Sequence, residues 1–175
     1  RAHMAATLDH LTQIFNRNAF THLLDKALKT DYRGLALVML DIDHFKSFND
    51  QYGHPLGDRV LQHVGQLLRE LLPPRAMAAR YGGEEFCVIM RDCHDLQTVY
   101  AFAERLRLKI QALRVKMRST DKVLDSITAS FGLALAQAGD DPEGLLTRAD
   151  EQLYKAKHNG RNQVQPSMSQ AALTA

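Results

Sequence analysis

The chain has 175 residues, of which 45% are hydrophobic and 24% are charged, and its net charge is +2. This length predicts one domain with a sizeable buried core. The weak positive charge is not typical of nucleic-acid-binding proteins, which gather Lys and Arg on one face. The apolar runs are far shorter than the roughly 20 residues that a membrane-spanning helix needs. We therefore expect a soluble domain with no nucleic-acid partner.

The two cysteines, Cys87 and Cys93, lack the spacing of a metal site. Unpaired thiols are typical of proteins in a reducing compartment, so we expect a cytoplasmic domain. An inner-membrane anchor elsewhere in a parent protein is compatible with this location. Residues 1–4 resemble the remnant of an expression tag, residues 5–165 form the expected domain, and residues 166–175 are expected to be a disordered tail.

The spacing of apolar residues predicts helices and strands along the whole chain. Apolar residues three and four apart indicate a helix, and a continuous apolar run indicates a strand covered on both faces. In chain order we expect a helix over 18–28, a strand over 35–40, a helix over 56–72, strands over 76–81 and 85–90, a helix over 95–117, a strand over 127–136 and a helix over 142–158. This order predicts an α/β fold of the α+β type, with a central, mostly antiparallel sheet flanked by helices.

Glycine and proline mark the ends of several expected elements. Pro73 and its neighbour Pro74 should end the helix before them, since proline removes a backbone donor. Gly82 and Gly83 should supply the positive φ angles of a tight hairpin turn. Gly160 should cap the last helix.

Four acidic residues flank strands that are expected to pair. Asp41 and Asp43 end the strand over 35–40, and Glu84 and Glu85 follow the glycine turn. Gathering ionised carboxylates is costly unless a cation compensates, and Mg²⁺ keeps positions open for substrate phosphates. The group therefore predicts a magnesium-nucleotide site. In the alternative, Asp43 caps the next helix and the two glutamates form an exposed hairpin edge.

The polar, glycine-containing stretch over 45–58 suits a pocket for a nucleotide base. Guanine presents two adjacent N–H donors that one carboxylate accepts, and an amide can meet its acceptors. Asp58 and Asn49 suit these two roles, and adenine would leave Asp58 facing a lone pair. In the alternative, Asp58 is an ordinary helix N-cap and Asn49 is a turn residue.

Three basic residues are candidates for binding phosphate. Lys157 and Arg161 are four residues apart, which places them on one face if the last helix reaches that far. Lys46 follows the first acidic pair. Lys and Arg donate charge-assisted hydrogen bonds to a triphosphate. In the alternative, the two residues near the helix end complement the helix dipole.

Several motifs, in order, resemble the GGDEF family of diguanylate cyclases. The signature is RYGGEEF at 80–86, in the common GGEEF form. The other matching stretches are DHLT at 9–12, DIDHFK at 41–46, GHPLGD at 53–58, TASFG at 128–132, LYKAK at 153–157 and GRN at 160–162. Each motif alone is weak, but the ordered set covers about residues 9–163. The resemblance implies a fold similar to the polymerase palm and the nucleotidyl cyclases.

The resemblance also implies an enzyme that condenses two GTP molecules into cyclic di-GMP and two pyrophosphates. Glu84 and Lys46 would be the catalytic residues. The ligands of two Mg²⁺ ions, replaceable by Mn²⁺, would be Asp41, the Ile42 carbonyl, Glu84 and Glu85. The substrate would contact Phe45, Asn49, His54, Asp58, Gly82, Gly83, Lys157 and Arg161. Each domain would hold one GTP, so catalysis would require a two-fold homodimer.

Two positions depart from the pattern of many relatives. Relatives with an inhibitory product site carry Arg-x-x-Asp ending five residues before the glycine pair, where this chain has Pro73 and Ala76. We therefore expect no inhibitory product site there. Asp9 and Arg17 are expected to form a structural ion pair. A sensory or membrane domain N-terminal to this one would normally impose dimerisation in a parent protein.

Two other functions stay open at this point. A degenerate GGDEF module would bind GTP as a regulatory ligand without turning it over. The intact residues that argue against this alternative are Asp41, Lys46, Glu84 and Glu85. A different palm-type cyclase would use ATP, which Asn49 and Asp58 disfavour.

Overall fold

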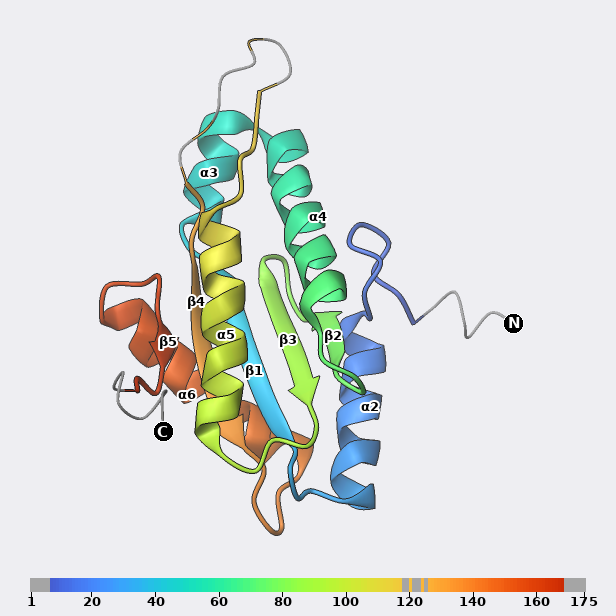
Figure 1. The fold of residues 1–175 in the computed structure, drawn as a ribbon. Helices are drawn as coiled ribbons and strands as arrows, with labels where there is room; N and C mark the ends of the chain where they lie inside the picture. Colours follow the sequence, from blue (N-terminus) through green and yellow to red (C-terminus); the bar gives the residue numbers. More distant parts are fainter. Residues whose placement is uncertain (1–6, 118–119, 121–123, 125, 169–175) are drawn as a thin grey trace.

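A computed structural model of the protein describes residues 7–117, 120, 124 and 126–168. Its helices are α2 (Arg17–Thr30), α3 (Phe45–Tyr52), α4 (His54–Leu71), α5 (Leu96–Gln111) and α6 (Pro142–His158), and its strands are β1 (Ala36–Ile42), β2 (Met77–Arg80), β3 (Glu85–Met90), β4 (Ala129–Leu135) and β5 (Val164–Gln165) (Figure 1). The expectations for residues 1–4 and 169–175 lie outside the described residues. In the described part, no helix is both long and apolar enough to cross a bilayer.

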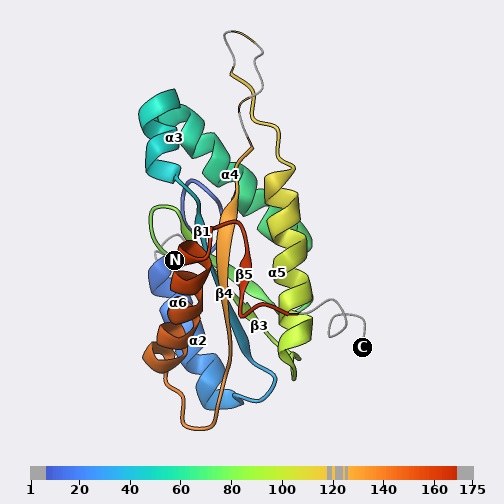
Figure 2. The same cartoon turned by 90° about the vertical axis from the view of Figure 1, so that its left-hand side faces the viewer.

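The strands form one sheet in the order β2-β3-β1-β4-β5. The pairs β2/β3, β3/β1 and β1/β4 are antiparallel, and β4/β5 is parallel. Figure 2 shows α2 and α6 on one side of the sheet and α5 on the other, and α4 packs into the same core as α5. The predicted α+β fold with a mostly antiparallel sheet is confirmed.

The side chains of β1 alternate between two cores, one on each face of the sheet. Val38 and Leu40 belong to the core under α4 and α5, whereas Leu37 and Met39 belong to the core under α2 and α6. Every residue of β1 is buried, which is why the sequence shows a continuous apolar run. Burial of each such side chain stabilises the fold by about 1.5–3 kcal/mol. The same alternation places Asp41 on the face covered by α2 and α6.

Helix α6 packs closely against the sheet at Gly132 of β4. A Cβ atom on Gly132 would lie 2.9 Å from the Cα atom of Leu153, and nearer still to the backbone atoms Ala149 O and Leu153 N. These atoms belong to the backbone of α6 and cannot move unless the helix moves. The missing side chain at Gly132 therefore sets how closely α6 packs on β4.

The structure has a helix, α3, where the sequence analysis expects neither a helix nor a strand between residues 40 and 56. Its apolar residues Phe45, Phe48 and Tyr52 follow helical spacing and pack against the core. The other five residues of α3 are polar, so its apolar face is too narrow to indicate a helix from the sequence. A helix of eight residues has little stability of its own, and tertiary packing therefore decides its formation.

Two further boundaries depend on contacts distant in sequence. Helix α5 ends at Gln111 and does not reach residue 117, because Val115 is buried outside the helix and its carbonyl accepts the N–H of Leu124 at 2.9 Å. Strand β5 has two residues and forms by pairing with Phe131 and Gly132. The other expected elements agree with the structure to within about two residues at each end.

Candidate active site

Acidic residues from the ends of β1 and β3 lie next to each other. Asp41 is the register partner of Glu85, and strand alternation places both on the face covered by α2 and α6. The carbonyl of Glu84 accepts the N–H of Ile42 at 3.2 Å. The structure thus brings together the acids that the sequence analysis groups.

A cavity of about 270 Å³ opens at this corner of the sheet. Its lining comes from the end of β1, the start of α3, the hairpin turn and the end of α6: Asp41, Ile42, Asp43, His44, Phe45, Lys46, Ser47, Glu84, Lys157 and Arg161. Of the residues expected to bind metal or phosphate, Glu85 lies outside this lining. Glu85 instead lines a neighbouring groove between α2 and α6.

Asp41 is a buried carboxylate, 8% exposed, whose Oδ2 lies 2.6 Å from the Nζ of Lys157. Burial raises the pKa of Asp41 to about 6; the Lys157 ammonium opposes this shift, and the charges of Glu84 and Glu85 add to it. A single ammonium therefore does not offset the burial and the neighbouring acids. The cavity is suited to an additional cation.

The donor groups fit an Mg²⁺ ion that is shared with a substrate. Asp41 and Glu84 offer carboxylate oxygens, and Ile42 offers a backbone carbonyl at the same place. Among the described residues, no three His, Cys, Asp or Glu side chains form a group that could hold a metal ion by themselves. Mg²⁺ typically takes one or two protein carboxylates and completes its octahedron with water and phosphate oxygens. The residues present therefore fit a metal that binds together with a nucleotide.

Asp43 is held by hydrogen bonds and is not a helix cap. Its carboxylate accepts the hydroxyls of Thr128 and Ser130, each at 2.7 Å, and the N–H of Asn162 at 3.0 Å. The N-cap of α3 is His44, which has φ 55° and makes no side-chain capping bond. The capping alternative for Asp43 is therefore wrong, because its oxygens face β4 and the turn after α6.

The glycine pair of the hairpin leaves room for other groups. Neither Gly82 nor Gly83 is among the described residues with positive φ, so that expectation is wrong. A Cβ atom on Gly82 would lie 2.6 Å from the Oε1 of Glu85, whereas one on Gly83 would meet nothing within 4 Å. Gly82 thus lets the Glu85 carboxylate fold over the turn, and Gly83 leaves an open surface beside Glu84.

Arg80 anchors this turn to the N-terminal segment. Its Nη2 donates to the carbonyl of Gly83 at 2.8 Å, and its Nη1 lies 3.4 Å from the carboxylate of Asp9. The expected pair of Asp9 with Arg17 is therefore wrong, because the N-terminal segment runs beside β2, where Arg80 is the nearer cation. Arg17 lies over the ring of Tyr81, 4.4 Å from its centroid.

Asn49, on α3, and Asp58, on α4, lie outside the cavity lining. Both structural alternatives for them are wrong, because Asn49 is inside a helix and the N-cap of α4 is Gly53. The side chain of Asn49 lies where a Cβ atom of Gly57 would be. Its Oδ1 is buried and has no hydrogen-bond partner among the described residues. Such an unpaired acceptor costs about 1–3 kcal/mol, which a donating ligand would recover.

The remaining expected substrate contacts differ in exposure. His54 begins α4 and is exposed, as is Asp58 one turn later. The ring of Phe45 is buried in the core between α3 and α4. The exposed pair is open to a ligand from solvent, whereas Phe45 supports the helix that carries Asn49.

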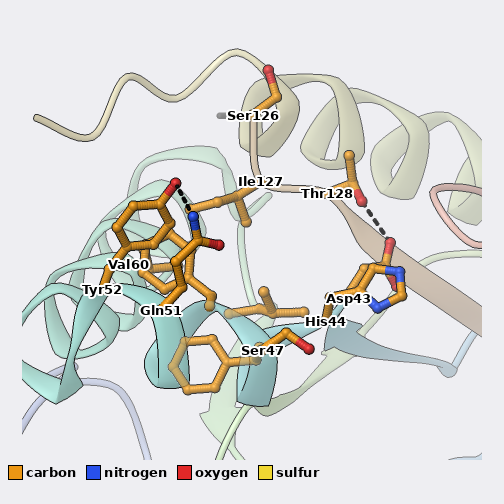
Figure 3. Close-up of a pocket in the computed structure, with 12 residues that line it drawn as sticks. Asp43, His44, Ser47, Gln51, Tyr52, Val60, Ser126, Ile127 and Thr128 are labelled. Carbon is orange, nitrogen blue, oxygen red and sulfur yellow. Dashed lines mark hydrogen bonds between the residues drawn. The ribbon is translucent and has the colours of Figure 1, made fainter. Parts of the chain in front are cut away.

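A second cavity, of about 190 Å³, lies between α3, α4 and the segment leading into β4 (Figure 3). Figure 3 shows Thr128 donating to Asp43 and Gln51 donating to the hydroxyl of Tyr52. Asn49 and Asp58 line neither cavity, and the two cavities share Ile42, Asp43, His44, Phe45 and Ser47. The residues expected to bind the base therefore do not line the cavity that Lys46, Lys157 and Arg161 line.

Lys157 and Arg161 both line the first cavity, although α6 ends at His158. Gly160 has φ 109° and follows the helix end, which confirms the expected cap. The N–H of Arg161 donates to the carbonyl of Ala156 at 2.9 Å, closing the turn. The two basic residues are therefore brought together by this C-terminal turn and not by helical spacing.

Comparison of this chain with known proteins identifies the family to which it belongs. The family profile described as "Diguanylate cyclase, GGDEF domain" matches residues 6–163. The chain belongs to the GGDEF family. The crystal structure of the GGDEF domain of DgcB from Caulobacter crescentus, in complex with c-di-GMP, matches this GGDEF domain with a TM-score of 0.87 and 40% identity, covering 91% of this chain and 92% of that chain.

Two curated relatives are much longer than this GGDEF domain. Diguanylate cyclase VdcA of Vibrio cholerae is 42% identical, and the match covers 92% of this chain and 47% of the relative. Response regulator PleD of Caulobacter vibrioides is 39% identical, and the match covers 91% of this chain and 36% of the relative. The chain therefore spans less than half the length of these two relatives.

The sequence analysis misses several partners of the site. Thr128 and Ser130 bind Asp43, and Arg80 holds the hairpin turn. A signal for the first two is present, because polar residues two apart at the start of an apolar strand face the same side. Nothing in the sequence near Arg80 indicates that it contacts Asp9.

Proposed function

We propose that this GGDEF domain is a diguanylate cyclase that condenses two GTP molecules into cyclic di-GMP and two pyrophosphates in the presence of Mg²⁺. The observation that carries the proposal is the cavity in which Asp41 and Glu84 lie with Lys46, Lys157 and Arg161. Acids that attract a divalent cation beside three basic side chains suit a metal-bound triphosphate. Diguanylate cyclases of this family generally need divalent metal ions.

The proposed reaction forms two phosphodiester bonds. The 3′-hydroxyl of each GTP attacks the α-phosphate of the other, loses its proton and displaces pyrophosphate, so two steps release two pyrophosphates. Bound Mg²⁺ would favour the 3′-alkoxide and neutralise charge on the leaving group. Asp41, the Ile42 carbonyl and Glu84 would hold the metal, with Glu85 beside them.

In this proposal the basic side chains bind the phosphates, and residues of α3 and α4 recognise the guanine base. Lys46, Lys157 and Arg161 would bind the phosphates, and Lys46 would also stabilise the charge that develops on pyrophosphate. Asn49 and Asp58 would read guanine, with Phe45 and His54 beside the nucleotide. Asp58 would accept the two adjacent N–H donors of guanine, and the amide of Asn49 would meet its acceptors. Gly82 and Gly83 would let the hairpin backbone approach the nucleotide closely.

We also propose that catalysis takes place between two copies of the domain. One set of acids serves one GTP, so two nucleotides must meet across a two-fold axis. The match covers less than half of VdcA and of PleD, and we propose that an N-terminal sensory or membrane domain imposes this dimer. A cytoplasmic location agrees with free Cys87 and Cys93.

The decisive experiment supplies the domain with Mg²⁺ and either GTP or ATP and identifies the products by mass. We expect cyclic di-GMP from GTP alone, with a rate that rises more than linearly with protein concentration. Binding of GTP without product at any protein concentration would favour the regulatory module. A cyclic product from ATP would refute the roles of Asn49 and Asp58.

Lys157 is expected to compete with a metal ion for Asp41 when no nucleotide is present. Its Nζ lies 2.6 Å from Oδ2 of Asp41, where it occupies an oxygen that a cation would need and offsets part of the negative charge. The Lys157→Met variant should therefore bind Mn²⁺ about tenfold more tightly without nucleotide, since a close competing charge is removed. Electron paramagnetic resonance of free Mn²⁺ measures this. Lys155→Met, at an exposed position of α6, is the matched control, and equal Mn²⁺ affinity in both variants would contradict the prediction.

Cyclic di-GMP is not expected to inhibit the enzyme through the site that many relatives use. Pro73 and Ala76 stand where that site requires Arg and Asp, and neither can donate or accept a charge-assisted hydrogen bond. Initial rates should therefore be unchanged, apart from competition with GTP, when product is added at up to about 100 µM, a concentration at which a site of micromolar affinity is saturated. Strong noncompetitive inhibition would show that this prediction is wrong.

A further inference from the structure

Asp43 connects three parts of the fold next to the cavity. Its Oδ2 accepts the hydroxyl of Thr128 at 2.7 Å and the N–H of Asn162 at 3.0 Å, and its Oδ1 accepts the hydroxyl of Ser130 at 2.7 Å. The bond from Thr128 is drawn in Figure 3. Three donors around one carboxylate use the oxygens that a metal ion would need. Asp43 therefore joins β1 to β4 and to the turn that follows α6.

The turn that Asp43 holds has an uncommon backbone. Arg161 has φ 64° and Asn162 has φ 47°, both in the left-handed region that non-glycine residues rarely adopt without compensating contacts. Asp43 supplies one such contact and α5 supplies another, because Nη1 of Arg107 donates to Oδ1 of Asn162 at 2.9 Å. Arg107 is itself fixed by Glu104 at 2.6 Å. The turn is thus anchored from both faces of the sheet.

Arg161 lies inside this anchored turn and lines the cavity. We propose that Asp43 is a positioning residue: by holding residues 160–162 it directs the guanidinium of Arg161 toward the phosphates of GTP. Asp43 touches neither substrate nor metal in this role, and Arg107 is the second anchor. The proposal rests on the proposed function, since Arg161 needs a polyphosphate to bind.

The negative charge of Asp43 favours a role in positioning Arg161 over a role that is limited to joining the strands. A carboxylate here adds negative charge to the cavity that Asp41 and Glu84 also line. A neutral acceptor would join the strands without adding that charge. Charge-assisted hydrogen bonds are shorter and stronger than neutral ones, so the carboxylate holds the N–H of Asn162 more firmly.

A double-mutant cycle on nucleotide binding tests the proposal with the whole chain. The probe is 3′-deoxy-GTP with Mg²⁺, which lacks the attacking hydroxyl and cannot react. We expect Asp43→Asn and Arg161→Met each to weaken its binding about tenfold, as loss of a charge-assisted bond predicts. The double variant should bind no more weakly than Arg161→Met alone, because Asp43 acts through Arg161. In turnover, Asp43→Asn should raise KM for GTP about tenfold with kcat nearly unchanged.

Thr128→Val is a milder variant that removes one donor to Asp43 and carries the same cycle if Asp43→Asn does not fold. Thr147→Val, at an exposed position of α6, is the matched control and should bind like the wild type. Additive losses in the double variant, or unchanged binding in both Asp43→Asn and Thr128→Val, would overturn the proposal. A wild-type chain that binds no 3′-deoxy-GTP would refute it together with the proposed function. Binding without formation of cyclic di-GMP from GTP would refute the cyclase activity only.

Discussion

The Glu84→Gln variant is expected to form cyclic di-GMP about 10³-fold more slowly than the wild type, because it loses a charge that holds the metal at the reacting atoms. Glu84 lines the cavity with Asp41. Among the described residues its carboxylate has no hydrogen-bond or ion-pair partner. The temperature of half-unfolding should therefore change by less than about 2 °C. Initial rates at a protein concentration that saturates dimerisation measure the effect.

Glu70→Gln is the matched control for this variant. Glu70 lies at an exposed position near the end of α4, so the same chemical change should leave the rate as in the wild type. An undiminished rate in Glu84→Gln at saturating Mg²⁺ would refute the role of Glu84. It would also leave Asp41 as the better candidate for the principal metal ligand.

The Gly132→Ala variant is expected to lose about 3 kcal/mol of unfolding free energy, the upper end of the usual penalty for overpacking a core. The added Cβ atom would meet the backbone of α6 at Ala149 and Leu153, and no side-chain rotation relieves that contact. For a domain of this size, the temperature of half-unfolding should fall by roughly 10 °C. Chemical denaturation followed by circular dichroism measures the loss.

Gly83→Ala provides the control for this stability prediction. A Cβ atom on Gly83 would meet nothing within 4 Å, and its φ is not positive. Stability should therefore stay within about 0.5 kcal/mol of the wild type. If Gly132→Ala were equally stable, α6 would have to shift on β4 without cost, which the packing of Leu153 against the sheet argues against.

Local signals in the sequence predicted most of the fold. The apolar run at residues 35–40 indicated a strand buried on both faces, and Gly160 marked the end of α6. Periodicity, capping and turn residues are read from neighbours along the chain, so they need no knowledge of the tertiary structure. The grouping of Asp41 with Glu84 could also be predicted, because it required only that two adjacent strands pair.

Tertiary structure alone decided the contacts between distant residues. Asp43 bonds to Asn162 across 119 positions, Lys157 pairs with Asp41 across 116, and Arg80 meets Asp9 across 71. No local pattern contains such partners, since which side chains meet depends on how the helices pack on the sheet. Tertiary structure also decided the formation of α3 and β5. These segments are too short to be stable without packing against the rest of the fold. The sequence by itself therefore determined which groups are available at the site, and packing determined which of them touch.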